Sequence, residues 1–298
     1  MQDRSNFLTE LPNPASEFLD SLSVEDQVKL MHQQDLQAAN AVGEVGPAIA
    51  AAVKIVTERL RLGGRLLYIG AGTSGRLGVL DASEIPPTFR ADPELVQGII
   101  AGGIPAIFKA QEGAEDDASG GERDLVAKNL TSKDVVFGIT AGGSTPYVHG
   151  ALRYAKTVGS ATIFLSCVAH FAGETEVDVV IRPLTGPEIV TGSTRLKAGT
   201  ATKLVLNTVT TLAMVGLGKT YGNWMVDVQA SNAKLRDRAA RIVQTLTATT
   251  RPRAEELLAL AGGHAKVAIT MHKLNATAET AKVALGAAGG SLRKATEK

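Results

Sequence analysis

The 298-residue sequence lacks several features that mark particular classes of protein. Its one cysteine, Cys167, excludes an intrachain disulfide. It has no run of about 18 or more apolar residues, which a membrane-spanning helix needs. The start, Met1–Asn6, has early charges and no apolar stretch, so no secretory signal is expected. The 31 basic and 30 acidic side chains form no block of one sign, which argues against a nucleic acid or membrane surface as partner. These absences favour a globular cytoplasmic protein.

Metal ligands are scarce as well. There is no H-E-x-x-H motif and no cysteine cluster, and the histidines show no ligand spacing, so no metal is expected. These histidines are His32, His149, His170, His264 and His272. Cys167 follows a predicted buried strand with no histidine arranged beside it, so we expect a small buried side chain rather than a nucleophile.

What the chain does have, from residue 65 onward, is an alternation of short apolar runs with helical stretches. Each run is nearly continuous in Val, Ile, Leu or Phe, which is typical of strands buried on both faces of a parallel sheet. The runs are Arg65–Ile69, Leu95–Ile100, Asp134–Ile139, Ala161–Ser166 and Val177–Ile181. The pattern predicts an open α/β sheet with right-handed crossovers.

The chain divides into three predicted parts. Residues 1–62 are expected to form an extended arm, to about residue 20, and helices that pack on the core or in a dimer interface. One helix follows a weak capping box at Ser23 and the next has Pro47 in its first turn. Residues 63–227 hold the sheet and a long helix, Leu196 to Lys219, with Gly222-Asn223 as its expected cap. Residues 228–298 read as a small all-α subdomain.

The first run ends in a loop of glycines and hydroxyls, Gly70-Ala71-Gly72-Thr73-Ser74-Gly75, and a helical pattern follows directly. This order puts free backbone N–H groups at a helix N-terminus, which is a site for an anion. The loop matches G-x-G-x-x-G, but a dinucleotide fold needs a carboxylate after the second strand, where Ala101-Gly102-Gly103 stands. A P-loop is excluded because Gly-Lys-Ser/Thr is missing. Gly72, Thr73 and Ser74 therefore suit a terminal phosphate monoester.

Similar loops follow other predicted strands. They are Thr140–Thr145, Thr185–Glu188 and Thr191–Arg195. Ligands of open parallel sheets bind at the carboxyl ends of the strands. Such loops at one edge therefore predict a site for a small polyoxygenated anion.

Three groups of carboxylates are candidates for proton transfer. Glu84 precedes Ile85-Pro86-Pro87, which would end its helix and give the side chain a fixed direction. Glu112 and Glu115 stand at i, i+3, on one face of a predicted helix, where a pair of acids is suited to proton transfer near neutrality. A solvated acidic turn explains the same pair equally well. Glu188 is a third candidate.

Together these motifs strongly resemble those of the N-acetylmuramic acid 6-phosphate etherases. The resemblance extends from about Thr9 to the C-terminal helices, and the segments that carry it are Gly70–Glu84, Pro86–Phe89, Glu112–Asp116, Gly192–Thr200, Tyr221–Asn223 and Met225–Asp227. It implies a sugar isomerase (SIS) fold, with a five-stranded parallel sheet sandwiched by helices, in a homodimer. It also implies removal of the D-lactyl ether from C3 of N-acetylmuramate 6-phosphate without a cofactor.

The resemblance also implies roles for individual residues. Glu84 would be the proton donor and Glu115 the second acid, while Thr73, Ser74, Ser144, Thr194 and Arg195 would surround the phosphate. Elimination across C2 and C3 of the open-chain sugar, then water addition, needs only two placed carboxylates and an anchored phosphate. Either glutamate could act at C2; our hypothesis assigns C2 to Glu115.

One geometric tension accompanies this assignment. Ser74 and Glu84 would lie roughly 15 Å apart on an unbroken helix, which is longer than a hexose phosphate. Either the helix ends early or Glu84 serves a site completed by the partner subunit. We expect a site near the dimer interface.

The sequence departs from the family pattern in three places. Ile85 replaces a usual Cys, the loop Ala141–Tyr147 has Gly-Gly-Ser where Ser-Gly-Arg is usual, and Val168-Ala169 replaces Asn-Pro after Cys167. The altered loop affects substrate contacts more than the reaction type.

Other readings of the motifs remain. A non-catalytic sugar-phosphate sensor of the glucokinase-regulatory-protein type and an aldose–ketose isomerase are the two main ones. A transcriptional regulator is disfavoured because Lys29 is the one Lys or Arg in Glu25–Ala52.

Overall fold

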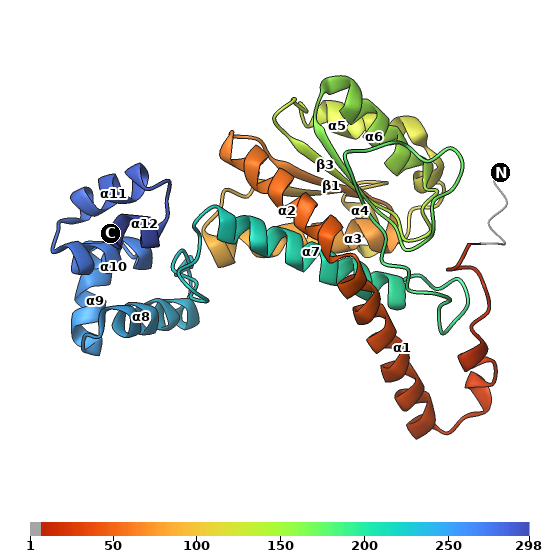
Figure 1. Ribbon diagram of the computed structural model, residues 1–298, viewed down its shortest axis with the longest axis horizontal. Coiled ribbons are helices and arrows are strands. Elements are labelled where there is room, and N and C mark those ends of the chain that lie inside the picture. The colour runs from red at the N-terminus through yellow and green to blue at the C-terminus, as the bar shows by residue number, and fades with distance from the viewer. Residues whose placement is uncertain (1–6, 298) are drawn as a thin grey trace. The chain divides into compact units, whose positions relative to one another are not determined.

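The computed structural model describes residues 7–297, so the charged start Met1–Asn6 and its part of the predicted arm lie outside the described residues. Figure 1 shows the elements of the chain. The strands are β1 Leu66–Gly70, β2 Val96–Ile100, β3 Val135–Ile139, β4 Ala161–Leu165 and β5 Val179–Ile181. The helices up to β5 are α1 Val24–Glu44, α2 Gly46–Arg61, α3 Gly72–Phe89, α4 Pro105–Phe108, α5 Ala118–Ala127 and α6 Pro146–Val158. Those after it are α7 Lys197–Gly216, α8 Ala233–Thr247, α9 Arg251–Leu260, α10 Ala265–Leu274, α11 Ala278–Ala287 and α12 Leu292–Thr296.

The strands form one five-stranded sheet in the order β2-β1-β3-β4-β5, and every pair is parallel. All five apolar runs became strands, with ends within two residues of the prediction. The predicted α/β fold is therefore confirmed. Because all strands run in the same direction, the loops after them share one edge of the sheet.

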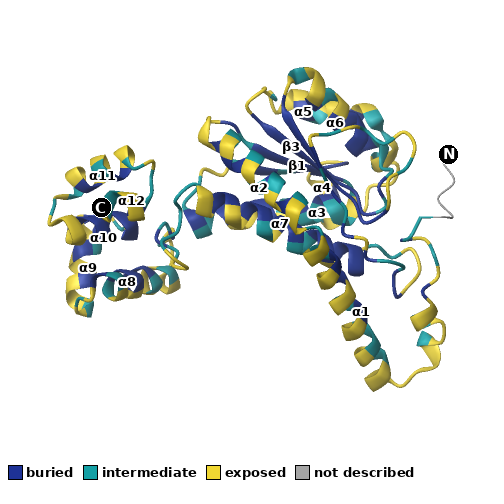
Figure 2. Ribbon diagram, in the orientation of Figure 1, coloured by how far each residue is buried: buried dark blue, intermediate teal, exposed yellow. Residues whose placement is uncertain are grey.

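Helices cover both faces of this sheet, and Figure 2 shows β1 and β3 buried. On one face, Leu67 and Ile69 of β1 pack in a cluster with Tyr147 and Val148 of α6. On the other face α3 approaches β1 so closely that a Cβ atom on Gly78 would lie 2.9 Å from Cβ of Tyr68. The alternate residues of β1 thus serve two different layers, which explains the continuous apolar run.

The chain before β1 combines short turns with two helices. The predicted extended arm contains 3₁₀ turns at Pro14–Ser16 and Leu19–Ser21. Ser23 caps α1 as predicted, since its Oγ accepts a hydrogen bond of 3.2 Å from the N–H of Asp26. Within residues 7–297 no single helix is long and apolar enough to cross a membrane; α1 and α2, bent by 62°, pass such a test only when taken together.

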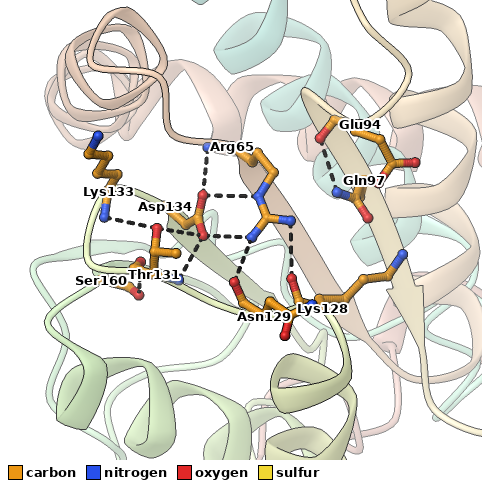
Figure 3. A network of polar contacts seen from close by, with 9 residues as sticks. All are labelled: Arg65, Glu94, Gln97, Lys128, Asn129, Thr131, Lys133, Asp134 and Ser160. Atoms are coloured by element: carbon orange, nitrogen blue, oxygen red, sulfur yellow. Dashed lines mark hydrogen bonds and ion pairs between the residues drawn. The ribbon is translucent and has the colours of Figure 1, made fainter.

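The amino edge of the sheet is held by a buried carboxylate, as Figure 3 shows. The side chain of Asp134 precedes β3, is 2% exposed, and accepts hydrogen bonds from the backbone N–H, Nε and Nη2 of Arg65, which precedes β1. It also accepts from the N–H and Oγ1 of Thr131. This network fixes the first residues of β1 and β3, two neighbouring strands of the sheet. It thereby also fixes where the carboxyl ends of these strands lie.

By its internal contacts the chain falls into two compact units. The first comprises residues up to Ser83 and Glu94–Val209, and the second comprises Glu84–Pro93 and the residues from Thr210 onward. The division therefore falls within α3 and within α7. The predicted boundary between residues 227 and 228 stays a prediction.

Two helix ends differ from the prediction. Helix α3 was predicted to end at Pro86-Pro87, but it continues to Phe89. The prolines remove the N–H groups that would bond the carbonyls of Ala82 and Ser83, a loss that the burial of Ile85 and Phe89 in the same turns offsets. Helix α7 ends at Gly216, not Lys219, because Gly218 takes a left-handed conformation (φ +73°) and the N–H of Lys219 bonds back to Met214 O.

The second unit has its own apolar core. Val226, Val243, Leu257 and Ile269 contribute to it and are almost fully buried. The ammonium of Lys266 is bound by the carbonyls of Gly218 and Gly290, at 2.9 Å each, and by Asp227. Burial lowers the pKa of Lys266. This buried ion pair ties the end of α7 to the loop before α12.

Candidate functional site

The glycine- and hydroxyl-rich loop joins β1 to α3, and its glycines allow a very close turn. A Cβ atom on Gly70 would lie 2.8 Å from the N atom of Gly75, and one on Gly75 would lie 2.6 Å from Cγ1 of Ile100. Gly72 opens α3 with φ +51°. The first intrahelical bond runs from Gly75 N–H to Ala71 O, so the N–H groups of Gly72, Thr73 and Ser74 precede the helical ladder. Gly72 is exposed and the two hydroxyl residues are half-buried. An anion can therefore reach three N–H groups and two hydroxyls.

A second stretch with hydroxyl groups lies beside this loop. A Cβ atom on Gly199, in the first turn of α7, would lie 3.7 Å from Cγ2 of Thr73 and 3.5 Å from the carbonyl oxygen of Thr194. Thr194 is half-buried and Arg195 is exposed. The structure thus brings Thr73 and Thr194, 121 positions apart in the sequence, to the same place on the first unit.

The loop after β3 reaches the same edge. Ala141 is buried in a cluster with Cys167 and with Ala198 of the first turn of α7. The hydroxyls of Thr140 and Thr145 bond each other at 2.8 Å across the loop. Ser144, between them, is half-buried. Three of the predicted loops therefore converge within the first unit.

Glu188 is a structural cap rather than a free acid. It is fully buried, and its carboxylate accepts hydrogen bonds from the backbone N–H groups of Lys197 (2.9 Å) and Ala198 (3.0 Å). Burial raises the pKa of Glu188, against the lowering effect of these two bonds. The carboxylate satisfies the start of α7, so the proton-transfer role considered from the sequence is not supported.

A buried lysine supports the same segment. The ammonium of Lys197 is hydrogen-bonded to the side-chain oxygens of Gln34 (2.9 Å) and Gln37 (3.2 Å) of α1 and to Pro187 O (3.1 Å). Burial lowers its pKa. Helix α1 therefore holds the chain that precedes and follows Thr194 and Arg195.

The acidic pair does not lie on one helical face. Gly113 takes a left-handed conformation (φ +73°) between Glu112 and Glu115, and only Ala114–Asp116 forms a 3₁₀ turn. The prediction that both glutamates lie on one helical face is therefore wrong, because the left-handed residue Gly113 interrupts the helical backbone between them. Both glutamates are exposed, whereas Ala114 packs against the core under α6 and so anchors the turn.

Glu84 is exposed on α3 and belongs to the second unit. The chain after it is bound there: Pro87 O accepts from the N–H of Gln229 (3.2 Å), and Arg90 donates to Val228 O (3.0 Å). The alternative that α3 ends early, which would have shortened the distance between Ser74 and Glu84, is wrong because the helix is unbroken. Ten residues of continuous helix separate the two, roughly 15 Å along the axis.

A buried triad went unnoticed in the sequence. Asp81 of α3, with its side chain 4% exposed, accepts hydrogen bonds from the hydroxyl of Tyr68 (3.0 Å) and the ammonium of Lys203 of α7 (2.7 Å). The signal was available, since Asp81 lies on the buried stripe of α3 that includes Gly78 and Ala82. A carboxylate on such a stripe needs a cation. The triad joins β1, α3 and α7, and its residues on the two helices come after the first turns of α3 and α7.

Among residues 7–297, no cluster of three or more His, Cys, Asp or Glu side chains could hold a metal ion. Cys167 is fully buried, as expected, and burial raises its pKa to about 12.

Comparison with known proteins gives similarities along the whole chain. Residues 48–156 match the model of the glucokinase regulatory protein N-terminal SIS domain, and residues 222–285 match that of the C-terminal lid domain of glucokinase regulatory protein. Three similar relatives carry the name N-acetylmuramic acid 6-phosphate etherase. The protein from Synechocystis sp. is 52% identical over 100% of this chain and 97% of its own. That from Gloeobacter violaceus is 53% identical with the same coverage, and that from Nostoc punctiforme is 54% identical over 91% of this chain and 88% of its own.

Proposed function

This chain belongs to the N-acetylmuramic acid 6-phosphate etherase family, and from that premise we propose that it cleaves the D-lactyl ether of N-acetylmuramate 6-phosphate. The products are N-acetylglucosamine 6-phosphate and D-lactate. Within the chain, the observation that supports this most is the approach of Thr73 to the start of α7, which gathers hydroxyls beside the N–H groups that precede the helical ladder of α3.

The sugar phosphate is anchored at the carboxyl edge of the sheet. The N–H groups of Gly72, Thr73 and Ser74 and the hydroxyls of the latter two bind the phosphate, as described for helix N-termini. Ser144, Thr194 and Arg195 complete its shell, and the guanidinium supplies the charge. Glu112, beside Glu115 in its exposed turn, contacts the sugar.

The two remaining acids perform the elimination. The aldehyde at C1 of the open-chain sugar acidifies the C2 proton, which Glu115 removes as a carboxylate. Glu84, protonated, gives its proton to the ether oxygen at C3. The C3–O bond breaks, lactate leaves with that oxygen, and an unsaturated aldehyde remains. The reverse assignment of the two glutamates is the alternative.

Water then completes the reaction. Glu84, now a carboxylate, takes a proton from water as the hydroxyl adds at C3, and Glu115 returns its proton to C2. One water molecule is consumed and both glutamates regain their starting protonation. No metal or cofactor is needed for either step.

We propose further that the protein acts in the cytoplasm as a homodimer, with the site near the dimer interface and completed by the partner subunit. Large apolar side chains are exposed on the arm and α1. Phe18 is 66% exposed, Val24 68% and Val28 61%, and a second copy would cover them.

The test is incubation with N-acetylmuramate 6-phosphate in ¹⁸O-water followed by mass spectrometry. We expect the label at C3 of the sugar and unlabelled D-lactate. Glu84→Gln and Glu115→Gln should each lose about 100-fold or more of the rate, as removal of a general acid or base does. Glu122→Gln, an exposed glutamate of α5, is the matched control and should keep full activity.

Other outcomes would contradict the proposal. Full lactate release by Glu84→Gln would remove its assigned role. Binding of sugar phosphate without turnover would favour a sensor, the function suggested by the names of the two matching domain models. A ketose product would favour an isomerase.

A further inference from the structure

We propose that His149 is a positioning residue that aims the backbone N–H of Ser144 at the substrate phosphate, by holding the carbonyl of Gly143. The inference rests on the proposed function, in which the loop after β3 contacts that phosphate. It adds a residue to which no role has been given, and a donor that is backbone rather than side chain.

His149 is fixed in the first turns of α6. It is 6% exposed, and its Nε2 lies 2.6 Å from Gly143 O while its Nδ1 lies 3.1 Å from Oγ1 of Thr175. The ring centroid lies 5.3 Å from that of Phe164 and 5.9 Å from that of Phe171. Both nitrogens are engaged and aromatic rings pack against the imidazole, so it has one orientation.

The partners of the two nitrogens determine which one carries the proton. A carbonyl oxygen only accepts, so Nε2 carries the hydrogen and donates to Gly143 O. Nδ1 then accepts from the hydroxyl of Thr175. Burial lowers the pKa of His149, against the raising effect of its bond to Gly143, which favours this neutral form at pH 7.

Both backbone polar groups of Gly143, its N–H and its carbonyl, are hydrogen-bonded. Its N–H donates to Thr140 O at 3.1 Å, and its carbonyl accepts from His149. Its φ is +79°, and a Cβ atom there would lie 2.6 Å from Cγ2 of Val168. Only glycine fits this place, and the residue cannot shift without breaking one of the two bonds.

The peptide bond passes this restraint on to Ser144. The described residues contain no cis peptide, so the Gly143 carbonyl and the Ser144 N–H point in opposite directions in one plane. The carbonyl points inward to the buried histidine. The N–H of half-buried Ser144 therefore points outward, and no hydrogen-bond acceptor for it is found in the described part of the chain. An oriented N–H group at this edge suits an anion.

The loop from Thr140 to Pro146 carries no cationic side chain. A rigid N–H donor next to the Ser144 hydroxyl therefore gives a phosphate a neutral partner there. The donor costs no reorganisation on binding, because the histidine already holds it in place.

The experiment uses full-length protein labelled with ¹⁵N-serine, so that Ser74 and Ser144 report separately, and each signal is assigned with its Ser→Ala variant. Inorganic phosphate is the titrant. In the natural protein we expect both amide signals to move with one dissociation constant. His149→Phe keeps a buried ring but removes both nitrogens; it should weaken phosphate binding and raise KM about 10- to 100-fold, the range for a hydrogen bond to a charged group.

The kinetic parameters separate positioning from mere structural support. The N–H binds the phosphate equally in ground and transition states, so kcat should stay within about threefold while KM rises. Thr175→Val removes the partner of Nδ1 and leaves the Nε2 bond, and should change KM by less than about threefold. His149→Gln, which retains a donor amide, should recover part of the loss.

Each outcome is informative. If phosphate moves the Ser74 signal and leaves Ser144 unmoved, the inference is wrong while the proposed anion site stands. If neither signal moves, both are wrong. If His149→Phe lowers kcat with KM unchanged, the histidine does not act through binding. Should His149→Phe fail to fold, the titration of the natural protein still decides.

Discussion

Alanine at Gly75 should damage the anion loop specifically. The added Cβ would lie 2.6 Å from Cγ1 of Ile100 and 2.7 Å from the carbonyl oxygen of Gly70. The isoleucine side chain can rotate, but Gly70 O is held by the N–H of Ala101 at 3.0 Å. The first turn of α3 must therefore retreat by about half an ångström or more to restore ordinary van der Waals separation.

Two magnitudes follow from this displacement. Inserting a methyl group into a closely packed site typically costs about 1–3 kcal/mol of stability. The N–H groups of Thr73 and Ser74 move with the turn, and loss of one charge-assisted hydrogen bond costs roughly 1.5–3 kcal/mol, or about 10- to 100-fold in KM. Both effects come from one methyl group that touches no substrate.

Urea unfolding and steady-state kinetics on N-acetylmuramate 6-phosphate measure the two effects separately. Gly43→Ala is the control, since a Cβ there meets nothing within 4 Å in the last turns of α1. It should leave KM unchanged and stabilise the protein by up to about 1 kcal/mol. The reasoning is refuted if Gly75→Ala has the same free energy of unfolding as the natural protein and a KM within twofold of it.

Three further predictions concern buried polar groups. Asp134→Asn should lower the free energy of unfolding by about 3 kcal/mol, since it removes one partner of a largely buried ion pair with Arg65. Burial by itself raises the pKa of Asp134, but the hydrogen bonds from Arg65 and the backbone have the larger effect, so the pKa is lowered overall. The contribution of Asp134 to stability is therefore complete above the unfolded pKa of about 3.9 and is lost as the pH falls through the pKa of the folded state. Urea unfolding below pH 5 should therefore show a smaller loss of stability on acidification in Asp134→Asn than in the natural protein. Lys203→Met should destabilise by about 3 kcal/mol because it takes the cation from Asp81, and Asp81→Asn in the same chain should recover most of this in thermal unfolding. Cys167 should not react with a thiol reagent at pH 8 until the protein unfolds, and rapid labelling of the native protein would contradict its burial.

Much of the fold could be predicted from local pattern. The strands stand out as continuous apolar runs because both faces of the sheet are covered, and their common direction places the loops after them at one edge. That was enough to predict the anion loop at Gly70–Gly75 and its chemistry. The cap of α1 at Ser23 is also a local signal, since its donor, the Asp26 N–H, is three residues away.

Other features needed three-dimensional information. The left-handed turn at Gly113 separated two glutamates whose spacing had suggested one helical face. Helix α3 continued through two prolines because Ile85 and Phe89, on either side of them, are buried, which propensity alone does not reveal. Glu188 looked like a candidate acid until its carboxylate was found on the N–H groups that open α7.

By itself, then, the sequence determined the fold class and the chemical family and predicted the anion loop, because periodicity and motifs depend on residues near one another in the chain. Only the tertiary structure decided which side chains are free for chemistry and which are structural. Lys197 meets Gln34 across 163 positions, and Lys203 meets Asp81 across 122. Such pairings depend on how helices pack, and a polar group's role depends on whether its partner is another residue or a substrate.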